Sequence, residues 1–488
     1  MMKKTTWILT LVLAIEGGMA QPLYHERWRP QFHFSPKAHW MNDPNGMVYY
    51  KGVYQLFFQY YPDSSVWGPM HWGHAESRDL VHWQEDPIAL FPDTLGYIFS
   101  GSAVVDRSNT SRFGQPDDVP LVAIFTQNDP VRASQNRNDF QNQSIAYSLD
   151  NGQDWMKYNH NPVLKNPGVT DFRDPKVFWY PEGHQWVMVL AVRDHVGFYT
   201  SPNLKDWYQA GEFGRDAGAH GGVWECPDLF PLNDGRGHTV WVLIVNINPG
   251  GPNGGSATQY FLGQFDGKTF TSSTAGTRWL DYGPDEYAGV TWSNTGNRRI
   301  FLGWMSNWLY GQRVPTTPWR SANTLPRELE LEKVGDSLYV KSTPVRELGE
   351  LTGRTERTKL SAPLPALSKL HVKTKNTGSF DLVLSDPAGD SVVIGYDSVA
   401  ARYHIDRRHA GVAMGPDFDR EYKAPRISRA PGIELDIYVD ASSLEVFADG
   451  GLTVMTALVF PSQPYDRVAV QGDAPENFSV TSLKSIHN

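Results

Sequence analysis

The sequence is poor in several features that would each point to a particular class of protein. It has a single cysteine, Cys226, among 488 residues, so no disulfide can form within the chain. Its net charge is −9 with no block of like charge, which argues against the basic patch of a nucleic-acid-binding protein. No run after the first twenty residues approaches the ~20 apolar residues that span a bilayer. Apolar residues at helical spacing are nearly absent too, which leaves β-structure as the expected fold class.

Residues 1–20 have the pattern of a secretory signal peptide. Lys3 and Lys4 precede a short apolar run at residues 7–15, and residues 18–20 provide a cleavage site, so we expect the mature chain to begin at Gln21. This pattern predicts an exported protein, periplasmic or extracellular. A chain of this size can build a large core and so can do without disulfides after export.

One local pattern recurs five times within residues 21–330. A polar residue leads into an apolar run, a turn and a second apolar run, and the five copies begin at Asp43, Ser100, Asp174, Glu225 and Glu286. Several copies end in a second shared pattern, in which a serine-ended strand, a tight turn and a tryptophan follow one another. Such units are typical of four-stranded antiparallel sheets, and five of them over roughly 300 residues predict a five-bladed β-propeller.

The pattern changes after about Arg327. Residues 345–488 contain strands with clean alternation of apolar and polar residues, as in 435–440 and 454–460, which predicts a C-terminal β-sandwich. We interpret residues 327–351 as the connection and the first strand of this second domain. The expected organisation is therefore an all-β chain with a propeller at 21–330 and a sandwich at 345–488.

Three of the five repeats begin with an acid in a distinctive setting. Asp43 stands in the run WMNDPNG, Asp174 in FRDP and Glu225 in ECP. Because the first strand of each propeller blade lines the central channel, these acids are expected to meet at one mouth of it, joined by Ser100 and Glu286. Clustered carboxyl groups raise one another's pKa, so one can stay protonated while another stays ionised. A retaining glycosidase needs such a pair of acid and nucleophile.

These three motifs, in this order, resemble those of glycoside hydrolase family 32, the retaining fructan and sucrose hydrolases that include invertases, inulinases and levanases. The resemblance covers nearly the whole mature chain and also implies a five-bladed propeller followed by a sandwich. It implies that Asp43 is the nucleophile and that Glu225 is the acid and base. Asp174 would bind fructose hydroxyls and stabilise the transition state.

The resemblance also implies a substrate-binding set and a substrate class. The runs 248–256 and 303–308 look like the levanase and exo-inulinase branch, which implies release of terminal fructose from β-2,6 or β-2,1 fructans, with sucrose as a further substrate. No metal and no organic cofactor is implied. The implied substrate-binding residues are Trp40, Asn42, Gln59, Trp67, Phe99, Ser100, Arg173 and Trp308.

Other interpretations remain open from the sequence. An endo-acting levanase, a sucrose-specific invertase and a fructosyltransferase would share the three acids, whereas a non-catalytic sugar-binding protein should have lost one of them. Cys226 is interpreted as a packing residue, since no histidine-based triad surrounds it. His71 and His74 point to opposite faces of a strand and are not expected to share a metal. The sandwich is expected to be a structural lid, and the sequence does not indicate the oligomeric state.

Overall fold

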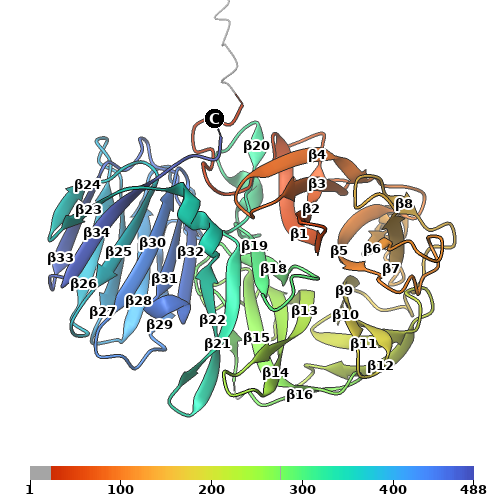
Figure 1. The fold of residues 1–488 in the computed structure, drawn as a ribbon. Coiled ribbons are helices and arrows are strands. Elements are labelled where there is room, and N and C mark those ends of the chain that lie inside the picture. The colour runs from red at the N-terminus through yellow and green to blue at the C-terminus, as the bar shows by residue number, and fades with distance from the viewer. Residues whose placement is uncertain (1–22, 275, 488) are drawn as a thin grey trace, which may run out of the picture.

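The computed structural model describes residues 23–274 and 276–487 (Figure 1). The predicted signal peptide at 1–20 lies outside these residues. Five antiparallel sheets are arranged around a central axis, and two further sheets stack beside them. The protein is thus a five-bladed β-propeller followed by a C-terminal β-sandwich, as predicted. Within the described ranges, no helix has the length and apolar character needed to cross a membrane.

The first three blades follow one another along the chain, each built from four consecutive strands. Blade 1 contains β1 (His39–Tyr50), β2 (Val53–Tyr61), β3 (His71–Ser77) and β4 (Trp83–Leu90). Blade 2 contains β5 (Tyr97–Val105), β6 (Leu121–Asn128), β7 (Gln141–Ser148) and β8 (Met156–Lys157). Blade 3 contains β9 (Phe172–Tyr180), β10 (Gln185–Val192), β11 (His195–Ser201) and β12 (Tyr208–Phe213).

Blades 4 and 5 complete the ring. Blade 4 contains β13 (Val223–Asn233), β14 (Thr239–Asn248), β15 (Ala257–Phe265), β16 (Phe270–Ser272) and β17 (Arg278–Trp279). Blade 5 contains β18 (Tyr287–Thr291), β19 (Ile300–Trp304), β21 (Arg327–Val334) and β22 (Ser337–Pro344). The short strand β20 (Trp319–Arg320) pairs in parallel with β1 and so ties the end of the ring to its beginning.

The fifth blade extends further than the sequence pattern suggested. Residues 327–344 were expected to connect the domains and to start the sandwich, but they form β21 and β22, the outer hairpin of blade 5. A blade needs two outer strands to cover its inner pair. In blade 5 a long loop after Trp304 separates these outer strands from the inner pair, so the repeat could not be followed in the sequence. The 3-10 turn η2 (Arg346–Leu351) then leads to the sandwich.

The sandwich consists of two six-stranded antiparallel sheets (Figure 1). One sheet contains β23 (Thr352–Thr358), β34 (Asn477–Leu483), β25 (Ser368–Lys373), β30 (Glu434–Asp440), β31 (Ser443–Ala448) and β32 (Thr453–Leu458). The other contains β24 (Ser361–Pro363), β33 (Arg467–Gly472), β26 (Phe380–Ser385), β27 (Ser391–Asp397), β28 (Arg402–His409) and β29 (Glu421–Pro425). Three short helical segments remain: α1 (Pro130–Ser134), η1 (Gly311–Arg313) and η3 (Asp449–Gly451).

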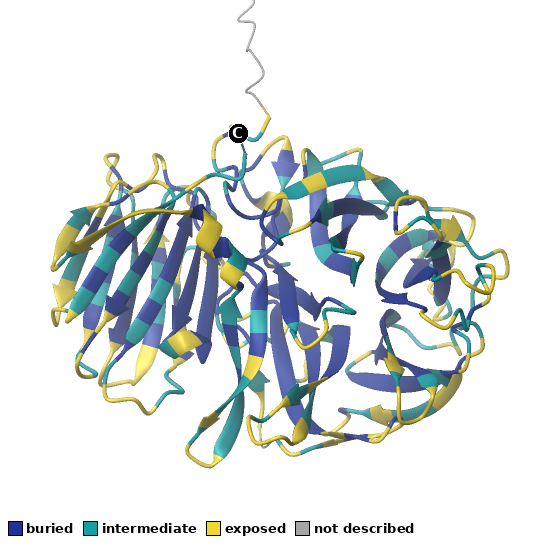
Figure 2. Cartoon of the chain, in the orientation of Figure 1, coloured by how far each residue is buried: buried dark blue, intermediate teal, exposed yellow. Residues whose placement is uncertain are grey.

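Burial decreases from the inner strands to the outer strands of a blade (Figure 2). Every residue of β6 is buried, whereas β12 is largely exposed. Apolar side chains of neighbouring blades pack face to face, which explains why the inner strands read as continuous apolar runs. The repeated tryptophans Trp83, Trp155 and Trp207 close three blades, and each indole N–H donates to the carbonyl three residues earlier, at 3.2, 2.9 and 3.0 Å.

Candidate active site

The inner strand of every blade contains a register shift near its start. In β1, β9 and β13 these shifts fall at Asp43, Asp174 and Glu225. Each shift coincides with a proline one or two residues later, which has no N–H to give to the ladder. A bulge of this kind redirects a side chain out of the sheet, so the X-Pro motifs of the sequence turn the acids toward the channel.

The three acids line one cavity of about 290 Å³ at the mouth of the channel. Ten of the eleven residues predicted for the site line this cavity, namely Asn42, Asp43, Gln59, Trp67, Phe99, Ser100, Arg173, Asp174, Glu225 and Trp308. They come from blades 1 to 4 and from the loop after β19. Carboxyl groups far apart in the sequence are thus brought into one small polar space.

Asp43 is held by three donors. The Asn42 amide donates to Oδ1 at 2.8 Å, the Ser100 hydroxyl donates to Oδ2 at 2.6 Å, and the Cys226 thiol lies 3.5 Å from the same oxygen. Burial raises the pKa of Asp43, the Ser100 hydrogen bond opposes this, and the charge of Glu225 raises the pKa further. These donors fix the carboxylate in one orientation, as an attacking group requires.

Asp174 has a backbone conformation that non-glycine residues rarely adopt, with φ of +62°. Its backbone N–H donates to the Thr126 hydroxyl at 3.0 Å, and its Oδ2 accepts the backbone N–H of Cys226 at 3.1 Å. Burial raises the pKa of Asp174 to about 7; Arg173 lowers this pKa, and Glu225 and Asp43 raise it further. The strained backbone indicates that neighbouring contacts hold this carboxyl in place.

Glu225 has a partner on each carboxylate oxygen. Arg173 Nη2 donates to Oε1 at 2.9 Å, and the hydroxyl of Tyr287 hydrogen-bonds to Oε2. Burial and then the charge of Glu225 hold the pKa of Tyr287 well above its usual value, so the phenol stays protonated as a donor. No sequence pattern pointed to Tyr287, because it lies beside Glu286 in a repeat whose acid was expected to point into the funnel.

Arg173 connects all the acids on its side of the cavity. Its guanidinium lies 2.9 Å from Glu225, 3.7 Å from Asp174 and 2.5 Å from Asp171. Burial alone would lower the pKa of Arg173, but Glu225, Asp174 and Asp171 hold it well above its usual value. The single guanidinium therefore compensates carboxylates that would otherwise repel one another. Asp171 also lines the cavity and was not among the predicted residues.

Two expectations need correction. Trp40 was expected in the aromatic wall but is fully buried behind it, where its indole N–H donates to Asn42 Oδ1 at 2.7 Å. Glu286 was expected in the funnel, yet it is buried next to Asp281 and Arg327 and does not reach the cavity. Successive side chains of a strand point to opposite faces, so Tyr287 meets Glu225 while Glu286 points away.

The remaining candidates also have defined places. Trp67 is 38% exposed at the cavity and packs edge-on to Phe99, with ring centroids 6.2 Å apart. The Gln59 amide nitrogen is buried without a hydrogen-bond partner among the described residues, and it belongs to a residue that lines the cavity. The donor atoms of His74, Glu76 and Asp86 lie within 4.8 Å of one another, but none of these three residues lines the cavity.

A β-propeller with a cluster of four carboxyl groups and one guanidinium at its channel mouth has the arrangement of a glycoside hydrolase. Comparison with known families agrees with this class. Residues 33–342 match the glycosyl hydrolases family 32 N-terminal domain, and residues 339–487 match the family 32 C-terminal domain. The chain belongs to glycosyl hydrolase family 32.

Similar proteins and structures come from bacteria and fungi. The chain is 45% identical over 480 residues to a levanase of Bacillus subtilis (93% of this chain, 70% of that protein). It is 40% identical over 509 residues to an extracellular exo-inulinase of Aspergillus awamori (93% and 94%). The crystal structure of exo-inulinase from Aspergillus awamori superposes with a TM-score of 0.89 at 36% identity, covering 95% of this chain and 99% of that one.

Proposed function

We propose that the protein is a retaining fructan hydrolase that releases terminal fructose from β-2,6 or β-2,1 fructans and also cleaves sucrose. The observation that carries this proposal is the placement of Asp43, Asp174 and Glu225 in one cavity, each from the inner strand of a different blade. The similarity to a levanase and to exo-inulinases supports a fructan as substrate. Their extracellular members also support export of this chain.

In the first step, Asp43 attacks the anomeric carbon of the terminal fructosyl unit. The bond from that carbon to the leaving oxygen breaks, and Glu225 gives its proton to this oxygen. The products of the step are a fructosyl ester of Asp43 and the shortened chain, or glucose when sucrose is the substrate. The Ser100 and Asn42 donors keep the Asp43 carboxylate oriented for the attack.

In the second step, Glu225 acts as a base. It takes a proton from water, the water oxygen attacks the anomeric carbon, and the ester bond to Asp43 breaks to release fructose. Glu225 is then protonated again and Asp43 is free. Arg173 and Tyr287 keep the Glu225 carboxyl in one position while its protonation state alternates.

Asp174 is assigned a stabilising role, in which it accepts hydrogen bonds from fructose hydroxyls and opposes the positive charge of the oxocarbenium-like transition state. Four carboxyl groups, those of Asp43, Asp171, Asp174 and Glu225, share the cavity with one guanidinium, so we expect the cluster to retain a proton near neutral pH. That proton is available to Glu225 as the acid. Gln59 has a free amide donor for a substrate hydroxyl, and Trp67, Phe99 and Trp308 offer ring faces.

The size of the cavity supports action at chain ends. Its volume of about 290 Å³ lies at the lower end of the range of small-molecule sites, about 300–1,000 Å³. Such a pocket accommodates one terminal sugar more readily than an internal stretch of polymer. An endo-acting levanase would need an open groove that passes the acids on both sides.

A timed product profile on levan, inulin and sucrose tests the proposal. We expect fructose as the sole early product from at least one polymer, and a loss of activity of at least about 10³-fold in Asp43→Asn, because the nucleophile is gone. A ladder of oligosaccharides from levan would identify an endo-acting enzyme instead. Full activity in Asp43→Asn, or no turnover of any of the three substrates by the wild type, would contradict the proposal.

A further inference from the structure

A second cavity lies at the other end of the inner strands. It has a volume of about 770 Å³ and is lined by residues of blades 2 to 5. Strand β9 connects the two sites, since Asp174 near its start lines the catalytic cavity and Tyr180 at its end lines the second cavity. Six residues of extended strand span roughly 20 Å, so the two sites lie on opposite faces of the propeller.

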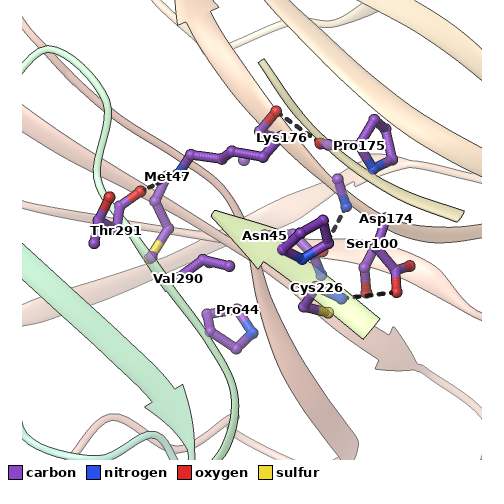
Figure 3. Close-up of a pocket in the computed structure, with 14 residues that line it drawn as sticks. Pro44, Asn45, Met47, Ser100, Asp174, Pro175, Lys176, Cys226, Val290 and Thr291 are labelled. Carbon is purple, nitrogen blue, oxygen red and sulfur yellow. Dashed lines mark hydrogen bonds between the residues drawn. The ribbon is translucent and has the colours of Figure 1, made fainter. Parts of the chain in front are cut away.

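The channel between the two cavities is closed to a sugar. Lys176 crosses it and donates from Nζ to the carbonyl of Thr291 at 2.5 Å (Figure 3). The same Nζ lies 3.0 Å from Asp228 Oδ2. The channel between Lys176 on one side and Asp174 and Cys226 on the other has a free volume of about 10 Å³, which is room for roughly one water. The second cavity is therefore a separate site and not the inner end of the catalytic one.

The second cavity has an exposed aromatic platform. Within the described residues, two tryptophans have more than a third of their surface exposed, Trp67 and Trp179, at 38% each. Trp67 lines the catalytic cavity and Trp179 lines the second one. The ring of Trp186 packs edge-on against Trp179 with centroids 5.1 Å apart, which fixes its orientation. A rigid indole at the wall of a cavity offers an apolar face on which a sugar ring can stack.

The cavity is also lined by two arginines, and one of them has a donor without an acceptor among the described residues. Arg299 is half-buried against the Phe230 ring, 4.8 Å from its centroid. Its Nε has no hydrogen-bond partner among the described residues, and burial lowers the pKa of the guanidinium while the charge of Asp228 opposes this. Arg107 donates to Asn294 at 2.7 Å at the rim. Hydroxyl-rich chains supply the acceptors that such groups lack, and an unsatisfied buried donor costs stability until one arrives.

We propose that the second cavity is a carbohydrate-binding site that holds an internal or distant segment of the fructan polymer, with Trp179 as the stacking platform and Arg299 as the main hydrogen-bond donor. The proposal rests on the proposed function for the identity of the polymer. Binding at this face raises the local concentration of chain ends at the catalytic cavity without touching the reacting atoms. Sucrose, which is too short to reach both faces, gains nothing from it.

The test compares polymer binding with sucrose turnover. Binding of inulin and of levan is measured by affinity gel electrophoresis in the Asp43→Asn background, alone and combined with Trp179→Ala or Arg299→Gln. Tyr208→Ala is the matched control, because Tyr208 is 63% exposed but lines neither cavity. We expect Trp179→Ala and Arg299→Gln to weaken polymer binding about 2- to 10-fold, and Tyr208→Ala to leave it unchanged.

The same substitutions in the active enzyme provide the second readout. We expect Trp179→Ala to raise KM for the polymer while kcat/KM for sucrose stays within about twofold of the wild type. Unchanged polymer binding, or an equal loss on sucrose and polymer, would overturn the second site. Binding of phosphate at 50 mM together with no binding of fructan would overturn it in favour of an anion site. If wild type cleaves no fructan, the proposed function fails, whereas the binding assay still decides whether the second cavity takes a sugar chain.

Discussion

Cys226 contacts Asp43, the proposed nucleophile, but its own thiol lacks the properties of a nucleophile. It is buried, and burial first and then Asp174 and Asp43 hold the pKa of its thiol well above the usual value. Its Sγ lies 3.5 Å from Asp43 Oδ2 and its backbone N–H holds Asp174. A neutral thiol is a weak nucleophile, so its contribution is to pack and orient the two acids.

We therefore expect Cys226→Ala to reduce kcat by about 10-fold or less, because one weak hydrogen bond and a little packing are lost. Alkylation of the native enzyme by iodoacetamide at pH 8 should proceed far more slowly than that of the unfolded chain, measured by mass spectrometry. Abolished activity in Cys226→Ala with an unchanged melting temperature would contradict this assignment.

Asp174 illustrates how a functional residue can reduce stability. Its pKa of about 7 in the folded protein is above the ~3.9 of an unfolded chain, so the folded state binds more protons between these values. Stability from this group is therefore lost as pH rises from about 4 to about 7.

We expect Asp174→Asn to be inactive but more stable than the wild type at pH 7.5 by about 1–2 kcal/mol, since the amide carries no charge to desolvate. At pH 4 the two proteins should unfold at similar denaturant concentrations. Chemical denaturation at both pH values measures this difference, and Asp117→Asn, at an exposed position, serves as the control. Equal stability of Asp174→Asn and wild type at pH 7.5 would refute the argument.

At the scale of elements, the glycine that ends the WMNDPNG motif is fixed by packing within blade 1. Gly46 has φ of +55°, and a Cβ at this position would lie 2.5 Å from Phe57 Cδ2 and 2.8 Å from Trp72 Cζ3. Both rings are fully buried. The absence of a side chain is what lets β1 bend after Asp43 while staying close to β2.

The matched comparison is Gly46→Ala against Gly52→Ala. Gly52 also has positive φ, +85°, but a Cβ there would meet only Arg78 Nη1 at 3.9 Å. Both variants carry the cost of the left-handed backbone, about 1 kcal/mol. Gly46→Ala adds overpacking of about 1–3 kcal/mol, so its melting temperature should fall clearly further and its kcat should drop as Asp43 shifts. Equal melting temperatures would contradict the steric argument.

The elements that could be predicted are those whose signals are local. The acid-Pro motifs indicated the inner strands of blades 1, 3 and 4, because a missing N–H and a bulge are properties of a few adjacent residues. The outer hairpin of blade 5 was missed because the loop after Trp304 interrupts the repeat. The directions in which the Trp40 and Glu286 side chains point were also predicted wrongly. A bulge reverses the alternation from which the direction of a side chain is predicted.

At the scale of the whole molecule, a buried ionic network joins the propeller to the sandwich. Arg327 lies 2.9 Å from Asp281 and 2.5 Å from Glu445, and His33 lies 2.9 Å from Glu445 and 2.7 Å from Asp440. Glu445 belongs to β31 of the sandwich. The propeller covers the face of β31 that carries Glu445. This contact joins residues more than 100 positions apart in the sequence, so no local pattern predicts it.

The protonation of His33 makes the stability of this interface depend on pH. Burial alone would lower the pKa of His33, but the hydrogen bonds to Asp440 and Glu445 raise it to about 9, against about 6.5 in an unfolded chain. Its stabilising contribution is fully present below pH 6.5 and is lost as pH rises through 9, amounting to about 3 kcal/mol over that interval.

His33→Gln should therefore be less stable than the wild type at pH 6, and the difference in unfolding free energy should shrink by pH 9.5. The reason is that, as pH rises over this range, only the wild type loses a buried positive charge between two carboxylates. Denaturant titrations at closely spaced pH values measure the difference. His82→Gln is the matched control, since His82 also pairs with a carboxylate, Asp79 at 2.8 Å, but on the surface where such pairs contribute little. A constant gap between His33→Gln and the wild type across this range would mean that His33 does not carry the charge that holds the two domains together.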